Sequence, residues 1–279
     1  MTNDELQISN KLPLSDTTVL VTRAAEQSNK FVSLLEQFGA TALSMSCLCI
    51  CPPSSYFQLD QAIFNLHQFD WLIFTSTNGV DYFLERLTTL GFDISKLTNI
   101  QVAVVGEKTA QHLTKYGLKA DFLPPEFVSD SLIESFPNWE NLKGTKILYP
   151  QLEAGGRENL VEGLTKEGAE IEAVPAYQSN CTTEIQLIIT TAFLKNQIDV
   201  VTFASPKTVG CFYQLIKSIS SESLLDNICI ASIGPVTSIA CQNIIGRVDV
   251  EANPYTLDGL INAIANWKKS PNHQPKSSV

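Results

Sequence analysis

A chain of 279 residues that is 44% hydrophobic and 17% charged has the composition of a globular protein and the length of two ordinary domains. Its formal net charge of −10 argues against a general nucleic-acid binder, and local hydrogen-bond donors would have to hold any anionic ligand. No stretch is apolar and long enough to cross a membrane, and the start of the chain lacks the features of a secretory signal. We therefore expect a cytoplasmic protein that binds neither membranes nor nucleic acid.

The chain contains a series of four strand–helix patterns, and the whole series occurs twice. Each pattern is a short apolar strand that leads into an amphipathic helix. The copies begin at Val19 and Ile147, at Asp70 and Asp199, at Ile100 and Ile228, and at Ala120 and Val248. One offset of about 129 residues relates all the pairs, which indicates an internal duplication. Strands that alternate with helices predict two α/β domains, each with a parallel sheet flanked by helices.

Two proline-bearing, extended segments occupy equivalent places in the two copies, at residues 44–53 and 173–182. Because both lie between a first and a second strand–helix pattern, we expect them to connect the domains. Residues 1–13 and 268–279 lie outside the repeat and are polar, so we expect flexible tails there.

Seven cysteines are scattered along the chain, most of them inside apolar runs. Their number is odd and no pair has the CxxC spacing, so we interpret all of them as reduced thiols of the core. No histidine stands close in sequence to complete a zinc site with the CxCxC segment at residues 47–51, so we expect no metal. The seven are Cys47, Cys49, Cys51, Cys181, Cys211, Cys229 and Cys241.

Small polar residues follow several strands, at the edge where parallel sheets bind ligands. The first turn of a following helix offers unpaired backbone N–H groups and the positive end of the helix dipole, which suit an anion. Two pairs of equivalent turns have this form: Thr75, Ser76, Thr77 and Asn78 with Ala204, Ser205, Pro206 and Lys207, and GEKT at 106–109 with GPVT at 234–237. Helix capping alone would explain any single turn. Four such turns favour a ligand with several carboxylates or phosphates, lying between two domains.

Other sequence motifs of catalysis are missing. The chain has no GxGxxG after a strand, no GxxxxGK[ST] and no GxSxG, which argues against a Rossmann dehydrogenase, a phosphate-loop enzyme and a hydrolase triad. If the protein is an enzyme, we expect it to work by positioning its substrate, assisted by one acid rather than a nucleophilic triad.

Seven segments, all in the order of the family, resemble uroporphyrinogen-III synthase. They are VLVTRAAEQ, FDWLIFTSTNGVDYF, VAVVGEKTAQHL, GGRENLVEGLTKEGAEIEAVPAYQS, DVVTFASPKTVGCF, ASIGPVTSIA and ANPYTLDGLINAI. The resemblance extends from about Val19 to Ile264. It implies two parallel-sheet domains of flavodoxin- or Rossmann-like type, joined by a two-stranded antiparallel connector with the active site in the cleft.

The resemblance also implies a topology in which one domain is discontinuous. Placed on this chain, residues 14–47 and 178–267 form the first domain and residues 50–175 the second. The chain then crosses between the domains near residues 45–51 and 174–180, which agrees with the connecting segments expected from the repeat.

The substrate that the resemblance implies is hydroxymethylbilane, a linear tetrapyrrole with eight carboxylate side chains. The family removes water and closes the macrocycle with inversion of the last pyrrole ring, by way of an azafulvene and a spiro intermediate. This is a lyase step of heme and chlorophyll biosynthesis that uses neither metal nor organic cofactor. We expect a monomer that contacts neighbouring pathway enzymes at most transiently. The alternative is a non-catalytic sensor or binding module for a polycarboxylate.

Tyr177, in PAYQS, matches the family's tyrosine at the cleft, so the resemblance implies that it donates a hydrogen bond or proton to the leaving hydroxyl. From the sequence alone, a packed residue at the hinge is the alternative. The substrate-binding residues that follow from the turns and the resemblance are Arg23, Thr75, Ser76, Thr77, Asn78, Gly106, Thr109, Arg157, Ser205, Pro206, Lys207, Gly234, Pro235 and Thr237. The second copy departs from the first at Pro150 and Gln151, which leave Arg23 without a counterpart.

Overall fold

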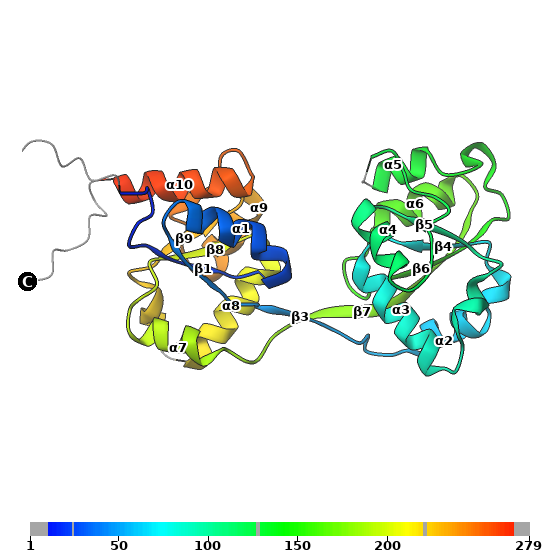
Figure 1. The fold of residues 1–279 in the computed structure, drawn as a ribbon, viewed down its shortest axis with the longest axis horizontal. Coiled ribbons are helices and arrows are strands. Elements are labelled where there is room, and N and C mark those ends of the chain that lie inside the picture. Colours follow the sequence, from blue (N-terminus) through cyan, green and yellow to red (C-terminus); the bar gives the residue numbers. More distant parts are fainter. Residues whose placement is uncertain (1–10, 24, 127–128, 220–221, 271–279) are drawn as a thin grey trace, which may run out of the picture. The chain divides into compact units, whose positions relative to one another are not determined.

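The computed structural model describes residues 11–23, 25–126, 129–219 and 222–270 (Figure 1). The structure divides into two units. The first unit joins the chain up to Cys49 with the chain from Cys181 onward, and the second unit is continuous from Ile50 to Asn180. Within the described ranges, no helix has the length and apolar character needed to cross a membrane.

The first unit is built on a five-stranded sheet in the order β10-β9-β8-β1-β2, in which all the paired strands are parallel. Its strands are β1 (Thr18–Val21), β2 (Thr41–Ser44), β8 (Val200–Phe203), β9 (Cys229–Ser232) and β10 (Val250–Glu251). Its helices are α1 (Ala25–Gln37), α7 (Leu187–Leu194), α8 (Pro206–Ile219), α9 (Pro235–Ile244) and α10 (Leu257–Lys269), with the 3₁₀ helix η4 (Glu222–Leu225).

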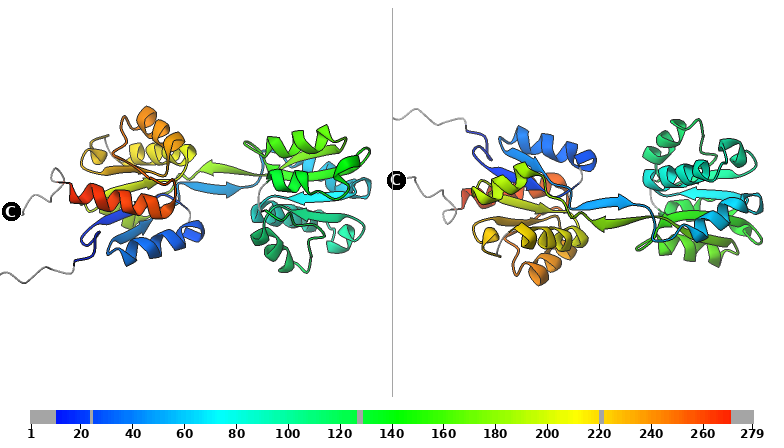
Figure 2. Two further views of the ribbon diagram at one scale, coloured as in Figure 1. Left: turned by 90° about the horizontal axis from the view of Figure 1, so that it is seen from above. Right: turned by 90° about the horizontal axis from the view of Figure 1, so that it is seen from below.

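Side chains of this sheet alternate between two hydrophobic cores, because successive residues of a strand point to opposite faces. Val19 and Val200 pack with α1 and α10 on one face, whereas Leu20 and Val201 pack with α7, α8 and α9 on the other (Figure 2). Burial on both faces explains why these strands are continuous apolar runs.

The second unit has a five-stranded sheet in the order β3-β7-β6-β4-β5. The strands β4, β5, β6 and β7 are parallel, and β3 runs opposite to its neighbour β7 (Figure 2). The strands are β3 (Leu48–Cys51), β4 (Trp71–Phe74), β5 (Gln101–Val104), β6 (Lys146–Leu152) and β7 (Glu170–Cys181). The helices are α2 (Phe57–Phe64), α3 (Thr77–Thr89), α4 (Glu107–Thr114), α5 (Ser129–Glu134) and α6 (Glu158–Lys166), with the 3₁₀ helices η1 (Leu66–Gln68), η2 (Ile94–Leu97) and η3 (Trp139–Asn141).

The helices of the second unit also cover both faces of its sheet. Helices α2, α3 and α4 pack on the face that carries Leu72 and Phe74, and α5 and α6 pack on the face that carries Trp71 and Ile73. The expected fold class, α/β with two mostly parallel sheets, is therefore confirmed.

The duplication is visible in the strand order. Reading from one edge, β9, β8, β1 and β2 of the first unit correspond to β5, β4, β6 and β7 of the second. Where the first unit has β10, the second has an isolated parallel bridge between Ala103 and Phe122. Each sheet therefore combines strands from both copies of the repeat: β1 and β2 come from the first copy, and β8, β9 and β10 from the second.

Equivalent aspartates confirm this correspondence at the level of side chains. Each accepts a hydrogen bond, 2.7 or 2.8 Å long, from the backbone N–H at the start of a neighbouring strand. The pairs are Asp70 with Lys146, Asp199 with Thr18, Asp121 with Val102, and Asp249 with Ile230.

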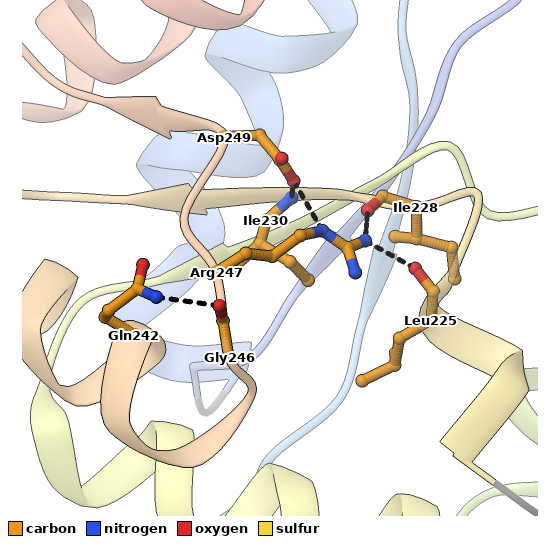
Figure 3. A network of polar contacts seen from close by, with 7 residues as sticks. All are labelled: Leu225, Ile228, Ile230, Gln242, Gly246, Arg247 and Asp249. Carbon is orange, nitrogen blue, oxygen red and sulfur yellow. Dashed lines mark hydrogen bonds and ion pairs between the residues drawn. The ribbon is translucent and has the colours of Figure 1, made fainter.

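Arg247 strengthens the last of these contacts (Figure 3). Its Nε donates to Asp249 over 3.2 Å, and its Nη2 donates to the carbonyl oxygens of Leu225 and Ile228, each over 2.6 Å. The network joins the loops that precede β9 and β10, at the amino edge of the first sheet. It therefore supports the fold at the edge opposite to the turns that were expected to bind a ligand.

The interpretation of all seven cysteines as thiols is wrong for two of them. Cys181, the last residue of β7, forms a disulfide with Cys211 in α8, with a Cα–Cα distance of 5.0 Å. The two are 30 residues apart, and spacing in the sequence does not reveal that they meet in the fold. The other five carry thiols, and burial raises the pKa of Cys47 and Cys241 to about 12.

Candidate active site

The turn between β4 and α3 lies at the carboxyl edge of the second sheet. The buried strand ends at Phe74, and Ser76 adopts an extended backbone (φ −155°, ψ 158°) from which the helix starts. The Ser76 hydroxyl accepts a hydrogen bond of 3.1 Å from the backbone N–H of Gly79, as a helix N-cap does. Thr75, Ser76, Thr77 and Asn78 are all half-buried. The turn therefore presents polar groups and the first N–H groups of a helix at the surface.

Tyr177 reaches this same turn from β7. Its hydroxyl lies 2.9 Å from the Ser76 hydroxyl, and either oxygen can be the donor. The Tyr177 side chain is only 8% exposed, and its ring stacks on that of Tyr82 in α3, with centroids 5.8 Å apart and planes 25° apart. The structure thus brings together two residues that are 101 positions apart in the sequence.

The surroundings of Tyr177 favour the neutral phenol. Burial raises its pKa above the ordinary value, while the hydrogen bond with Ser76 lowers it. Tyr149 raises the pKa of Tyr177 as well, and the guanidinium of Arg157 lowers it. Since burial is the largest effect, Tyr177 keeps its proton at neutral pH.

Tyr149 is a second tyrosine at the turn, and the sequence analysis did not single it out. It lies in β6, is 1% exposed, and its hydroxyl is 3.2 Å from that of Thr75. Because successive residues after a strand point to opposite faces, Thr75 meets Tyr149 on one side and Ser76 meets Tyr177 on the other. The placing of β6 between β4 and β7 brings both rings here, and no local signal in the sequence shows that placing.

The loop that follows β6 lies next to Tyr177. The backbone N–H of Glu153 donates to the Tyr177 carbonyl oxygen over 2.8 Å, and the Glu153 carboxylate accepts from the backbone N–H of Ser54 over 3.2 Å. Arg157 stands at the N-cap of α6, where its side chain is exposed. Its positive charge acts on Tyr177 and lowers the pKa of the phenol.

The turn between β5 and α4 is the second predicted turn of this unit. Gly106 caps α4 with an extended backbone, and open space surrounds the position that a Cβ would occupy. The Thr109 side chain is only 5% exposed. What this turn offers to a ligand is therefore mainly the backbone around Gly106.

In the first unit, Ser205 occupies the place that Ser76 has in the second. Its hydroxyl accepts from the backbone N–H of Thr208 over 3.3 Å and pairs with the Thr208 hydroxyl at 2.8 Å. Pro206 and Lys207 follow it at the start of α8 and are exposed. The turn is a capped helix start with a cation beside it.

The remaining predicted residues of the first unit lie at the ends of β1 and β9. Arg23 is half-buried just after β1. Gly234 caps α9 beside the ring of Tyr255, and Pro235 is exposed at the first helical position. Thr237 is 4% exposed, so it resembles its counterpart Thr109.

These residues share one edge within each unit. Because β9, β8 and β1 are adjacent and parallel, Gly234, Ser205 and Arg23 follow neighbouring strands at the carboxyl edge of the first sheet. In the second unit, contacts connect Tyr177 to Ser76 and Tyr82. Among the described residues, no three histidine, cysteine, aspartate or glutamate side chains are placed to hold a metal ion.

The sequence as a whole is similar to proteins of known family. Residues 29–262 match the family model described as uroporphyrinogen-III synthase HemD. A uroporphyrinogen-III synthase from Synechococcus elongatus is 43% identical over 260 residues, which are 92% of this chain and 97% of that one.

Solved structures of two synthases resemble the fold. The enzyme from Helicobacter pylori has a TM-score of 0.55 at 17% identity and matches 90% of this chain and 99% of its own. A mutant of the Thermus thermophilus enzyme has a TM-score of 0.50 at 19% identity and matches 90% of this chain and 98% of its own. At these identities the likeness concerns the fold alone.

Proposed function

The chain belongs to the uroporphyrinogen-III synthase family and is a cyclising lyase of tetrapyrrole biosynthesis, and on this premise we propose that Tyr177 is its acid and hydroxymethylbilane its substrate. The observation that carries the proposal is the Tyr177 hydroxyl, held 2.9 Å from Ser76 at a helix start on the carboxyl edge of a parallel sheet. This is the edge where such sheets bind ligands.

The substrate's carboxylates would bind to the turns. A chain with a net charge of −10 repels a polycarboxylate at long range, so local donors must supply the attraction. Helix starts with unpaired N–H groups provide such donors, and Arg23, Arg157 and Lys207 add positive charge beside them. We assign binding to the backbone and side chains of Arg23, Thr75, Ser76, Thr77, Asn78, Gly106, Thr109, Arg157, Ser205, Pro206, Lys207, Gly234, Pro235 and Thr237. Thr109 and Thr237 are buried, and the Thr109 N–H already donates to the Gly106 carbonyl oxygen over 2.9 Å, so at these two turns the N–H groups next to Gly106 and Gly234 would make the contact.

Tyr177 would assist the departure of the substrate's hydroxyl group. Its raised pKa keeps the phenol protonated at neutral pH, so it can donate to the hydroxyl as the carbon–oxygen bond breaks. Water then leaves, and the electron-rich pyrrole stabilises the positive charge that remains. The Tyr82 ring and the Ser76 hydroxyl hold the phenol in place during this step.

The proposal is tested by the product. Hydroxymethylbilane is generated in place, the protein is added, and the oxidised porphyrin isomers are separated by chromatography. A dominant type III isomer is expected. The type I isomer alone, as forms without protein, would overturn the proposed substrate and role of Tyr177.

A further inference from the structure

We infer that Ser76 is a positioning residue that donates its hydroxyl hydrogen to Tyr177 and so directs the Tyr177 hydrogen toward the substrate. The inference rests on the proposed function, because it concerns the proton that Tyr177 delivers. The Ser76 hydroxyl then serves Tyr177, and a substrate carboxylate at this turn is bound by backbone N–H groups instead.

The hydroxyl groups of Ser76 and Tyr177 have one hydrogen each, and only one of the two can lie between their oxygens. A hydroxyl has one hydrogen and two acceptor positions. The Gly79 N–H already fills one acceptor position of Ser76, and the 2.9 Å contact between the two oxygens needs one hydrogen. If Tyr177 supplies it, the phenol offers the substrate only an acceptor. If Ser76 supplies it, the phenol hydrogen is available for donation.

The helix start favours the second arrangement. A hydroxyl that accepts a hydrogen bond becomes a better donor, so the Gly79 N–H strengthens donation by Ser76. When Ser76 donates, its oxygen becomes richer in electrons. The positive end of the α3 dipole favours such an oxygen at the helix start. The resulting series of hydrogen bonds runs from the Gly79 N–H through the hydroxyls of Ser76 and Tyr177 to the hydroxyl of the bound substrate.

The ring of Tyr177 has little freedom to turn away from Ser76. Tyr82 stacks on the ring, and the Tyr82 hydroxyl donates to the carbonyl oxygen of Ile50 over 3.0 Å. The backbone N–H of Glu153 donates to the Tyr177 carbonyl oxygen and so fixes the Tyr177 backbone. Both partners of the hydrogen bond are therefore fixed, which is what a directional donor requires.

The first unit shows that this pairing is not a general property of the turn. Ser205 stands in the equivalent place, and its hydroxyl pairs with Thr208 inside its own helix. The residue that corresponds to Tyr177 in the other copy of the repeat is Leu48, which has no hydroxyl. Among the described residues, the duplicated turn thus pairs with a phenol in the second unit and with a threonine of its own helix in the first.

The test separates helix capping from donation. Ser76→Ala removes both, whereas Ser76→Thr keeps a hydroxyl that can do both. Thr256→Ala is the matched control for capping, since the Thr256 hydroxyl accepts from the Gly259 N–H over 3.0 Å at the start of α10. We expect Ser76→Ala to lower kcat about tenfold or more with little change in KM, and Ser76→Thr to restore most of it.

Two further measurements identify the path through Tyr177. In Tyr177→Phe, the added change Ser76→Ala should reduce kcat by less than about twofold, because residues that act as one unit are not additive. The ultraviolet titration of tyrosinate, taken as the difference from Tyr177→Phe, should show a higher Tyr177 pKa in Ser76→Ala than in the wild type.

The outcomes distinguish this inference from the proposed function. Additive losses in the double variant, or an unchanged Tyr177 titration in Ser76→Ala, overturn the role of Ser76 while leaving the synthase assignment intact. If Thr256→Ala lowered kcat as much as Ser76→Ala does, the loss of a helix cap would be enough to explain the result. That outcome would also overturn the role of Ser76. Wild-type turnover in Tyr177→Phe overturns the assignment of the acid and this inference together.

Discussion

A single phenol, buried among two other tyrosines and a serine, is the most specific chemical feature of the second unit. Tyr177 contacts Ser76 and Tyr82, and Tyr149 lies close enough to affect its pKa. Burial raises the pKa of Tyr177, so this phenol is neutral at neutral pH. The charge near it comes from Arg157, which is exposed.

Replacing the phenol by a ring of the same shape should remove the chemistry and keep the fold. We expect Tyr177→Phe to lower turnover at least about 100-fold, within the range of general acid catalysis. The ring still packs on Tyr82, so circular dichroism and Tm should change little. A Tm drop large enough to unfold the variant at assay temperature would instead indicate a structural role.

The raised pKa of Tyr177 also predicts the alkaline side of the pH profile. Burial stabilises the protonated form, so the group loses its proton only as pH rises through a value above the ordinary one of about 10. Turnover should therefore not fall through ionisation of this group between about pH 7 and 10. Rates measured across this range, with folding followed by circular dichroism, check the expectation. A decline with a midpoint below the ordinary phenol pKa, absent in Tyr177→Phe, would contradict it.

The strands themselves were predicted more accurately than the order in which they lie side by side in the sheets. The apolar runs that open at Val19, Asp70, Ile100 and Ile228 correspond to strands β1, β4, β5 and β9, because burial on both faces leaves a clear local signal. The position of Tyr149 opposite Thr75 depends on which strands are adjacent, and that is decided by packing over long sequence separations. The Cys181–Cys211 bond was missed for the same reason. The domain bounds and the roles of the site residues stay predictions.

Glycines at the ends of helices offer a test of how an element stops. Gly39 follows α1 with φ +91°, and a Cβ there would lie 2.7 Å from the Cβ of Leu12. Gly91 follows α3 with φ +83°, and a Cβ there would meet nothing within 4 Å. We expect Gly91→Ala to cost about 1 to 2 kcal/mol for the left-handed backbone alone, and Gly39→Ala to cost clearly more. Denaturant unfolding of both variants measures the difference, and equal losses would show that Leu12 moves aside.

At the scale of the molecule, the two units have different covalent constraints. The first unit contains the Cys181–Cys211 bond, which closes a loop of 30 residues. No disulfide joins described residues of the second unit. By lowering the entropy of the unfolded chain, a disulfide across such a loop stabilises the folded state by about 3 to 4 kcal/mol.

Reduction should therefore destabilise one unit selectively. A dithiol reductant is expected to lower the unfolding transition of the first unit and to leave that of the second unchanged. Calorimetry with and without the reductant measures the shift, and Cys211→Ala serves as the control in which the reductant should have no further effect. An equal shift of both transitions would contradict the assignment of the bond to the first unit's stability.

The mixed origin of the sheets has a consequence for how the chain is made. Strand β1 pairs with β8, and Thr18 bonds to a residue 181 positions later. At about 5 to 20 residues per second, a ribosome needs roughly 10 to 40 s to synthesise that interval. During this time the continuous second unit can emerge and fold, whereas β1 and β2 wait with an apolar edge exposed to chaperones and to other nascent chains.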